Sequence, residues 1–500
     1  MSVKICFIGA GSLGFTRQLL TDCMSVPELR KAKIVFTDIN EQNLEMVATL
    51  CQRDLNSNGV DTQIETTTNR REAFKDANYV INSIRVGGLE AFETDVEIPL
   101  KYGVDQCVGD TLCIGGIMYG QRVIATMLDF CKDMREVSSP DVIHLNYSNP
   151  NAMATWACNT FGGVHTIGLC HGEIHGEEQI AEVLGYTREE LDFICAGINH
   201  QTWYLSVKKD GIELRDKILE GFEKHEKYSE EEKVRIDILR RFGYYSTESN
   251  GHLSEYLAWY RKRPEEINSW ISLSNWIHGE TGGYLRVCRE GRNWFEVDFP
   301  NLMKEEPKNY DGSDRSVEHG SYIIEALETR KSYRGHFNVI NKNCITNLPE
   351  DCVVEVPCYV DGNGISVPQV GDLPMGCGAI CAQSVNVQRL AVMAAIEGNV
   401  TLLKQAALLD PLTGAVCNPE EVWQMVDEML IAQEQWLPQY KSEIENIKKE
   451  WERRASQNKL IPPRDYVGAA KLKEMTIEEM SLNSEKMRKM ASAVAKEKVE

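Results

Sequence analysis

A chain of 500 residues with 42% hydrophobic content is long enough to bury a large core, which excludes a single small binding module. The formal net charge of −21 argues against a nucleic-acid-binding surface, because such a surface needs a basic stripe and none is visible in the sequence. We therefore expect an enzyme-sized globular protein whose partner is a small molecule and not a nucleic acid.

The sequence also predicts the cellular compartment of the protein. No uninterrupted apolar run reaches the roughly 18 residues of a membrane span, and residues 1–4 lead directly into a strand and not into a signal peptide. Sixteen cysteines are scattered along the chain without the tight framework of a small secreted domain, a pattern typical of free thiols in a reducing compartment. We expect a cytoplasmic protein without a membrane partner.

The first predicted elements form a dinucleotide-binding unit. An apolar strand, Lys4–Ile8, leads into Gly9-Ala10-Gly11-Ser12-Leu13-Gly14, and a helix-like segment follows. The three glycines allow a tight turn, a close approach of the backbone to a pyrophosphate and close packing of the helix, whose N-terminus faces the anion. We therefore predict that Gly9, Gly11, Ser12 and Gly14 bind the cofactor. The alternative is another doubly wound sheet, in which the glycine loop only turns the chain.

The next strand, Lys33–Thr37, ends on Asp38. A carboxylate at this position accepts hydrogen bonds from ribose hydroxyls and repels a 2′-phosphate, so the sequence predicts NAD and not NADP. A central strand over residues 78–84 then ends in Arg85-Val86-Gly87-Gly88, where the backbone can pass close to the nicotinamide half. We assign Arg85 to the cofactor site.

Two further polar segments follow predicted strands or loops. The glycine-rich loop at residues 109–116 holds the carboxylate of Asp110. A strand from residue 141 ends in Asn146 and Asn149 before Pro150. Amides at a strand end can bind hydroxyl groups of a sugar or a cofactor. The alternative, that both asparagines only form the turn before Pro150, stays open.

A short buried strand over residues 164–169 ends on Cys170 and His171, and another apolar run ends on His200. A thiolate and an imidazole at the ends of parallel strands form a plausible transition-metal site. Cysteine is also among the most buried residue types, so a structural thiol is the alternative.

From about residue 200 the alternation of strands and helices fades. The aromatic segment 242–256 collects tyrosines, carboxylates and a histidine, which suggests the wall of a site or an ordinary packed loop. We expect an α/β fold: an N-terminal Rossmann-like doubly wound parallel sheet (residues 1–200), an intimately packed C-terminal α+β domain for substrate binding and oligomerisation (residues 201–440), and a charged helical extension (residues 441–500).

Six motifs, in one order, resemble glycoside hydrolase family 4, a group of NAD- and manganese-dependent glycosidases that departs from the usual two-carboxylate mechanism. They are Gly9-x-Gly11-Ser12, Gly109-Asp110-Thr111, Asn146-Tyr-Ser-Asn149-Pro150, Gly168-Leu-Cys170-His171, Ala196-Gly-Ile-Asn199-His200 and Phe242-Gly-Tyr-Tyr. The resemblance covers roughly residues 1–440. Within the family, Cys170-His171 and the stretch 244–249 look like the α-galactosidase branch. Two departures are Gly172, where that branch typically has serine, and Asn250-Gly251, where it has Ser-Glu.

The resemblance implies a reaction cycle that returns its cofactor unchanged. Bound NAD⁺ would take a hydride from C3 of the sugar, and the resulting ketone would acidify the C2 proton. A metal, Mn²⁺ in particular, held by Cys170 and His200 as its only protein ligands, would bind the C2 and C3 oxygens as a Lewis acid. The aglycone would leave by elimination, water would add, and the cofactor would return the hydride.

The resemblance also implies roles for individual side chains. A tyrosine would remove the C2 proton, with Tyr245 as the first candidate and Tyr244 as the second. His171 would lie beside the leaving group as an acid or a substrate ligand. Asp110 and Asn149 would hold sugar hydroxyls or support the metal.

We therefore expect a glycosidase of carbohydrate metabolism, an α-galactosidase first, acting as a homodimer or homotetramer. An α-galacturonide, an α-glucoside or a sulfoquinovoside is the alternative substrate, because Gly172 leaves room for a larger C6 group, with Arg85 or Arg334 as its counter-charge. The alternative of another class is an NAD-dependent 2-hydroxyacid dehydrogenase, which would consume NAD and need no metal. A third alternative is a non-enzymatic regulator that binds NAD. It is disfavoured because such a protein would have no use for the cysteine and histidine motif.

Overall fold

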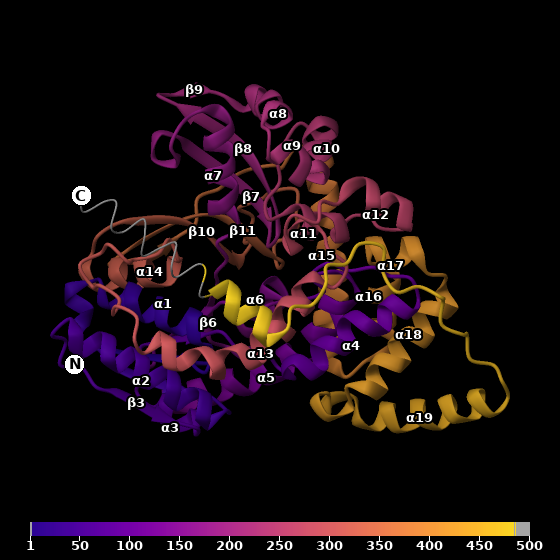
Figure 1. Ribbon diagram of the computed structural model, residues 1–500, viewed down its shortest axis with the longest axis horizontal. Coiled ribbons are helices and arrows are strands. Elements are labelled where there is room, and N and C mark those ends of the chain that lie inside the picture. Colours follow the sequence, from indigo (N-terminus) through magenta and orange to yellow (C-terminus); the bar gives the residue numbers. More distant parts are fainter. Residues whose placement is uncertain (1–2, 485, 487–500) are drawn as a thin grey trace.

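The computed structural model describes residues 3–484 and 486, with the backbone alone for residues 293–296. Within this part of the chain, one sheet of twelve strands runs through the molecule in the order β3-β2-β1-β4-β5-β6-β10-β11-β7-β8-β9, with β12 on β11. Figure 1 shows the early strands and helices in indigo at the lower left and the purple to magenta β7–β9 segment toward the top. The α/β fold class is confirmed.

The N-terminal half is a doubly wound parallel sheet. Its strands pair in the order 3-2-1-4-5-6, which is the order of a dinucleotide-binding fold. The strands are β1 (Lys4–Ile8), β2 (Lys33–Thr37), β3 (Ile64–Thr67), β4 (Tyr79–Asn82), β5 (Ile143–Asn146) and β6 (His165–Gly168). The helices between them are α1 (Leu13–Met24), α2 (Glu41–Ser57), α3 (Arg70–Phe74), α4 (Gly88–Lys101), α5 (Cys113–Val137) and α6 (Asn151–Ala157). Fully buried side chains along β1 and β4 suit strands covered on both faces.

The C-terminal half extends the same sheet with antiparallel strands. Asn338 on β10 pairs with Gly168 on β6, and Glu355 on β11 pairs with Gly197 on β7. The strands are β7 (Asp192–Ile198), β8 (Gln201–Lys209), β9 (Ile212–Glu213), β10 (Tyr333–Ile340), β11 (Val353–Asp361) and β12 (Gly364–Ser366). The expected boundary at residue 200 falls in the turn between β7 and β8.

The remaining helices follow β6 in the chain. They are α7 (Gly172–Leu184), α8 (Arg215–Lys224), α9 (Tyr228–Glu231), α10 (Lys233–Phe242), α11 (Asn250–Tyr256), α12 (Pro264–Trp270), α13 (Gly283–Leu302), α14 (His319–Thr329), α15 (Met375–Glu397), α16 (Val400–Leu409), α17 (Pro411–Val416), α18 (Pro419–Ala432) and α19 (Lys441–Ser456). The predicted charged extension begins with α19, and residues 477–484 are again helical. Residues 485 and 487–500 of that extension lie outside the described residues.

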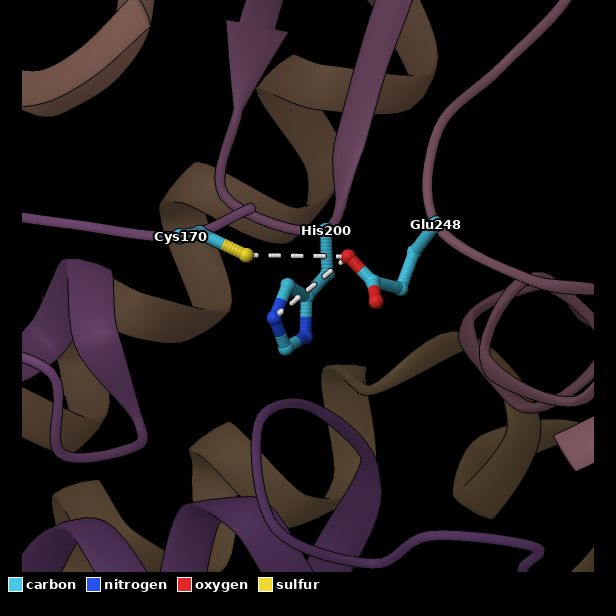
Figure 2. A group of neighbouring side chains, drawn as sticks. All are labelled: Cys170, His200 and Glu248. Atoms are coloured by element: carbon cyan, nitrogen blue, oxygen red, sulfur yellow. Dashed lines mark hydrogen bonds and ion pairs between the residues drawn. The ribbon is translucent and has the colours of Figure 1, made fainter. Parts of the chain in front are cut away.

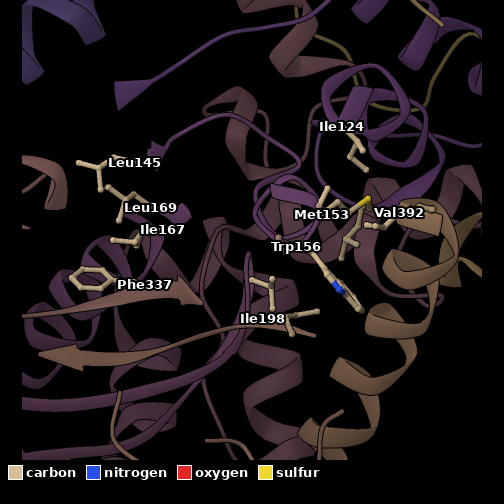
Figure 3. Packing of buried hydrophobic residues seen from close by; sticks show 14 of the residues in the cluster. Ile124, Leu145, Met153, Trp156, Ile167, Leu169, Ile198, Phe337 and Val392 are labelled. Carbon is tan, nitrogen blue, oxygen red and sulfur yellow. The ribbon is translucent and has the colours of Figure 1, made fainter. Parts of the chain in front are cut away.

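A continuous core joins the two halves. Ile167 of the parallel sheet and Phe337 of the antiparallel strands belong to the same buried cluster as Trp156 of α6 and Val392 of α15 (Figure 3). Helix α15 is long and apolar enough to cross a membrane by length and composition, but it packs against α5, α6 and α16 in the position of a core helix. The shared core supports the expected intimate packing.

Candidate active site

A cavity of about 1480 Å³ lies along the carboxyl ends of the parallel strands. Its walls include the segments that follow β1, β2, β4, β5 and β6, and residues from the antiparallel half close it. Ligands of open α/β sheets bind at this edge, where the strand order reverses, here between β1 and β4. The volume is large enough for a dinucleotide and a small second ligand together.

The glycine loop after β1 forms one part of the cavity wall. Gly9 has a φ of +81°, and a Cβ there would lie 2.9 Å from the Ser83 carbonyl, so this position requires glycine. The Gly11 N–H donates to Asp38 Oδ2 at 2.8 Å. Ser12 is the N-cap residue of α1. Gly9, Ser12 and Asp38 line the cavity, as a nucleotide site needs.

The third glycine of the motif behaves differently from its predicted role. Among the described residues, a Cβ placed on Gly14 would meet no atom of another element within 4 Å, so the structure does not show the close helix packing that the motif suggested. A Cβ on Gly11, in contrast, would lie 2.9 Å from Asp38 Oδ2. The requirement for glycine therefore rests on Gly9 and Gly11.

Further along the cavity, three predicted residues meet. Asp110 is buried, and its Oδ2 accepts hydrogen bonds from Arg85 Nη2 and Asn149 Nδ2, each at 3.2 Å. The Arg85 guanidinium carbon also lies 4.4 Å from the ring centre of Phe92 and 5.1 Å from that of Tyr284. These contacts hold both charges at the cavity wall.

Arg334, the other predicted counter-charge, does not line the cavity. It is exposed on β10, and its Nη2 donates to the Phe193 carbonyl at 2.6 Å. The structure therefore leaves only Arg85 of these two arginines within reach of a bound ligand.

Glu255, for which the sequence predicted no role, supports the loop that carries Asp110. Its buried carboxylate accepts hydrogen bonds from the backbone N–H groups of Cys107, Val108 and Gly109 at 2.6, 2.9 and 3.1 Å. Burial raises the pKa of Glu255 to about 7, although these donors act in the opposite direction. The contacts fix the turn that carries Asp110 toward the cavity.

At the other end of the cavity, Cys170, His200 and Glu248 converge (Figure 2). Cys170 follows β6, His200 lies in the turn between β7 and β8, and Glu248 precedes α11. Glu248 Oε2 lies 3.6 Å from Cys170 Sγ and 3.8 Å from His200 Nε2. Cys170 and His200 thus lie close together, as predicted. Glu248, which the sequence places only in a segment that could form the wall of a site, lies beside them.

The donor set fits a divalent transition metal. Thiolate, imidazole and carboxylate are all metal ligands in proteins, and Tyr256 OH lies 3.3 Å from His200 Nδ1, which turns Nε2 toward the cluster. Burial raises the pKa of the Cys170 thiol well above its usual range, and Glu248 raises it further. A bound cation would reverse this effect, because metal binding deprotonates a thiol.

His171 lines the cavity beside this cluster and contacts Glu318, with 2.8 Å between Nδ1 and Oε1. Burial would lower the pKa of His171, but the hydrogen bond and charge of Glu318 raise it to about 9. The ion pair with Glu318 therefore favours the protonated form of the imidazole.

The two predicted tyrosines do not reach the cavity. Tyr245 is fully buried in a separate hydrophobic cluster, stacked on Phe222 at 4.3 Å, and its hydroxyl donates to Gln179 Oε1 at 3.1 Å. The ring of Tyr244 lies 4.5 Å from the Arg215 guanidinium carbon. Neither tyrosine lines the cavity, so the structure does not support their assignment as the base.

The departure at residues 250–251 has a structural reason. Asn250 begins α11, where the sequence suggested a loop, and its Oδ1 accepts from the Val234 N–H at 2.7 Å while its Nδ2 donates to the His278 carbonyl at 2.8 Å. A Cβ on Gly251 would lie 2.5 Å from the Ile277 carbonyl oxygen. Both residues serve packing behind the cavity wall.

The comparisons with known protein families, sequences and structures agree with one another. The model of the family 4 glycosyl hydrolases matches residues 4–186, and that of the family 4 glycosyl hydrolase C-terminal domain matches residues 195–413. An α-galactosidase of Rhizobium meliloti is 54% identical over 97% of this chain and 98% of its own. An α-galactosidase of Bacillus subtilis is 35% identical over 88% of this chain and 100% of its own. The crystal structure of a 6-phospho-α-glucosidase from gut microorganisms in complex with NAD and Mn²⁺ covers 88% of this chain with a TM-score of 0.73 and 21% identity, which shows a shared fold.

Proposed function

The chain belongs to family 4 of the glycosyl hydrolases and is a glycosidase, and from this premise we propose that it cleaves α-galactosides with bound NAD and Mn²⁺. One observation carries the proposal: the Cys170, His200 and Glu248 cluster opens into the same cavity as the glycine loop and Asp38. A redox cofactor and a metal would thus flank one substrate. The 54% identity to the Rhizobium meliloti α-galactosidase supports the choice of sugar.

The residues of the cavity have distinct proposed tasks. Gly9, Ser12 and Asp38 would hold the dinucleotide, and Cys170 and His200 the metal. When bound, NAD supplies reversible hydride acceptance and the metal supplies Lewis acidity.

The remaining polar side chains would handle the sugar itself. The Asp110 carboxylate would accept hydrogen bonds from its hydroxyls, and the Asn149 amide would donate to them or accept from them. Protonated His171 would deliver a proton to the leaving oxygen. The pairing of Arg85 with Asp110 balances the arginine charge, which favours a neutral galactoside over a uronide or sulfoquinovoside.

A panel of nitrophenyl glycosides, assayed with NAD⁺ and Mn²⁺, tests the substrate. We expect the α-galactoside to be cleaved at least about tenfold faster than the α-glucoside, because one well-placed hydrogen bond to the axial 4-hydroxyl is worth about 1.4 kcal/mol. NADH should not accumulate, since a net oxidation would indicate a dehydrogenase. Faster cleavage of a galacturonide or sulfoquinovoside would overturn the galactoside assignment and leave the family intact.

Cofactor preference should depend on Asp38. We expect Asp38→Ala to narrow the preference for NAD⁺ over NADP⁺ by about 10- to 100-fold in titrations of the purified protein, because a charged hydrogen bond to ribose is worth about 1.5–3 kcal/mol. Asp38→Asn is the matched control for charge, because it keeps an acceptor for the Gly11 N–H. An unchanged ratio of the two affinities in Asp38→Ala would contradict the assignment.

We also propose a cytoplasmic homodimer or homotetramer that acts on a small glycoside without nucleic-acid or membrane partners. Sixteen free cysteines support the reducing location, and the net charge of −21 supports the absence of a nucleic-acid partner. The division into an NAD domain (1–200), a substrate and oligomerisation domain (201–440) and a C-terminal extension (441–500) is part of this proposal.

A further inference from the structure

The carboxylate of Glu248 occupies the space where a side chain at position 172 would lie. An ideal Cβ built on Gly172 would be 1.8 Å from Glu248 Oε2 and 2.7 Å from its Cδ, and the three nearest atoms all belong to Glu248. Gly172 is the first residue of α7, and its φ is not in the left-handed region. The backbone therefore accepts other residues here, and it is the Glu248 side chain that requires glycine.

Among the residues that the structure describes, no lysine or arginine pairs with Glu248 in this space. Within the described part of the chain, its ion-pair partner is His200, and its Oε2 also approaches the thiol of Cys170. The side chain is only 10% exposed. A buried carboxylate that points at a thiol and an imidazole calls for a cation between them.

We infer that Glu248 is a third protein ligand of the metal, and that Gly172 is the residue that makes room for it. The inference rests on the proposed function, because it takes the Cys170 and His200 pair as a metal site. A carboxylate is a ligand type that suits Mn²⁺, whereas the thiolate favours softer metals. Glu248 thus adds an oxygen ligand to the cysteine and histidine pair, and a Cβ at position 172 would overlap its carboxylate in the position that it holds here.

Binding of Mn²⁺ to the full-length protein with NAD⁺ tests the inference, with isothermal titration calorimetry as the readout in place of activity. We expect Glu248→Gln to weaken Mn²⁺ binding by at least about tenfold, the lower end of the loss seen when even supporting residues of metal sites are changed. Gly172→Ala should cause a similar loss, because its methyl group occupies the carboxylate position. The double variant should lose no more than the larger single loss, since both changes remove one interaction.

Two controls separate ligation from general effects. The melting temperature of the Gly172→Ala variant should not fall below that of the wild type, because alanine is favourable in a helix. Glu318→Gln removes a carboxylate that contacts His171 and not the cluster, so its Mn²⁺ affinity should stay within about threefold of the wild type.

The outcomes distinguish this inference from the proposed function. If the wild type binds Mn²⁺ and Glu248→Gln binds it equally well, or if the two single losses add in the double variant, Glu248 is not a ligand that Gly172 admits. The proposed function would then stand with Cys170 and His200 as the protein ligands. If the wild type binds no divalent metal at all, the proposed function and this inference are overturned together.

Discussion

Replacing Cys170 by serine is expected to lower the rate of α-galactoside cleavage by at least about 100-fold at saturating NAD⁺ and Mn²⁺. The serine hydroxyl keeps the size of the side chain but does not ionise at neutral pH, so the metal loses a charged ligand at the end of β6. Treatment of the wild type with a chelator should produce the same loss, and added Mn²⁺ should restore the rate. Metal content measured on the purified variant should fall in parallel.

Cys288→Ser is the matched control for this substitution. Cys288 is partly exposed on α13, outside the Cys170, His200 and Glu248 cluster and outside the cavity lining, so its replacement should leave the rate within about twofold. A reducing agent should preserve activity of the wild type, because the site depends on a free thiolate. If metal-free protein were fully active in the presence of a chelator, the reaction would not require a metal.

The sequence was sufficient to predict the parallel half of the fold and the residues at its edge. Strands β1, β2 and β4 are short apolar runs followed by polar or glycine residues, and the carboxyl ends of parallel strands meet at one edge. Asp38 and Cys170 were therefore predictable as neighbours of one cavity from their positions after such runs, whereas Asp110 lies in a loop between α4 and α5 and follows no strand.

The residues of the antiparallel half could not be placed in the same way. β structure near residue 355 is visible in the sequence, but its pairing with Gly197 joins segments far apart in the chain. Glu248 lies in an irregular segment positioned by the bridge between Trp203 and Ser246. Because such a segment has no period, the sequence does not show that Glu248 faces the cluster while Tyr245 faces a hydrophobic core.

Gly11→Val is expected to weaken NAD⁺ binding by at least about 100-fold, since it removes two interactions each worth a charged hydrogen bond. A Cβ at position 11 would lie 2.9 Å from Asp38 Oδ2 and 3.1 Å from Asn43 Cβ, so the branched side chain must displace Asp38, which we propose binds the ribose. The same methyl groups would fill the space through which the pyrophosphate approaches the backbone. Calorimetric titration with NAD⁺ measures the loss directly, and glycosidase activity should disappear at ordinary cofactor concentrations.

Gly14→Ala provides the control from within the same motif. A Cβ at position 14 would meet no atom of another element within 4 Å in the part of the chain that the structure describes, so this variant should bind NAD⁺ within about twofold of the wild type. The contrast between positions 11 and 14 separates steric exclusion of the cofactor from a general effect of altering the glycine loop. Wild-type affinity in Gly11→Val would show that the dinucleotide does not pass this loop, whereas an equal loss in both variants would point to destabilisation of α1.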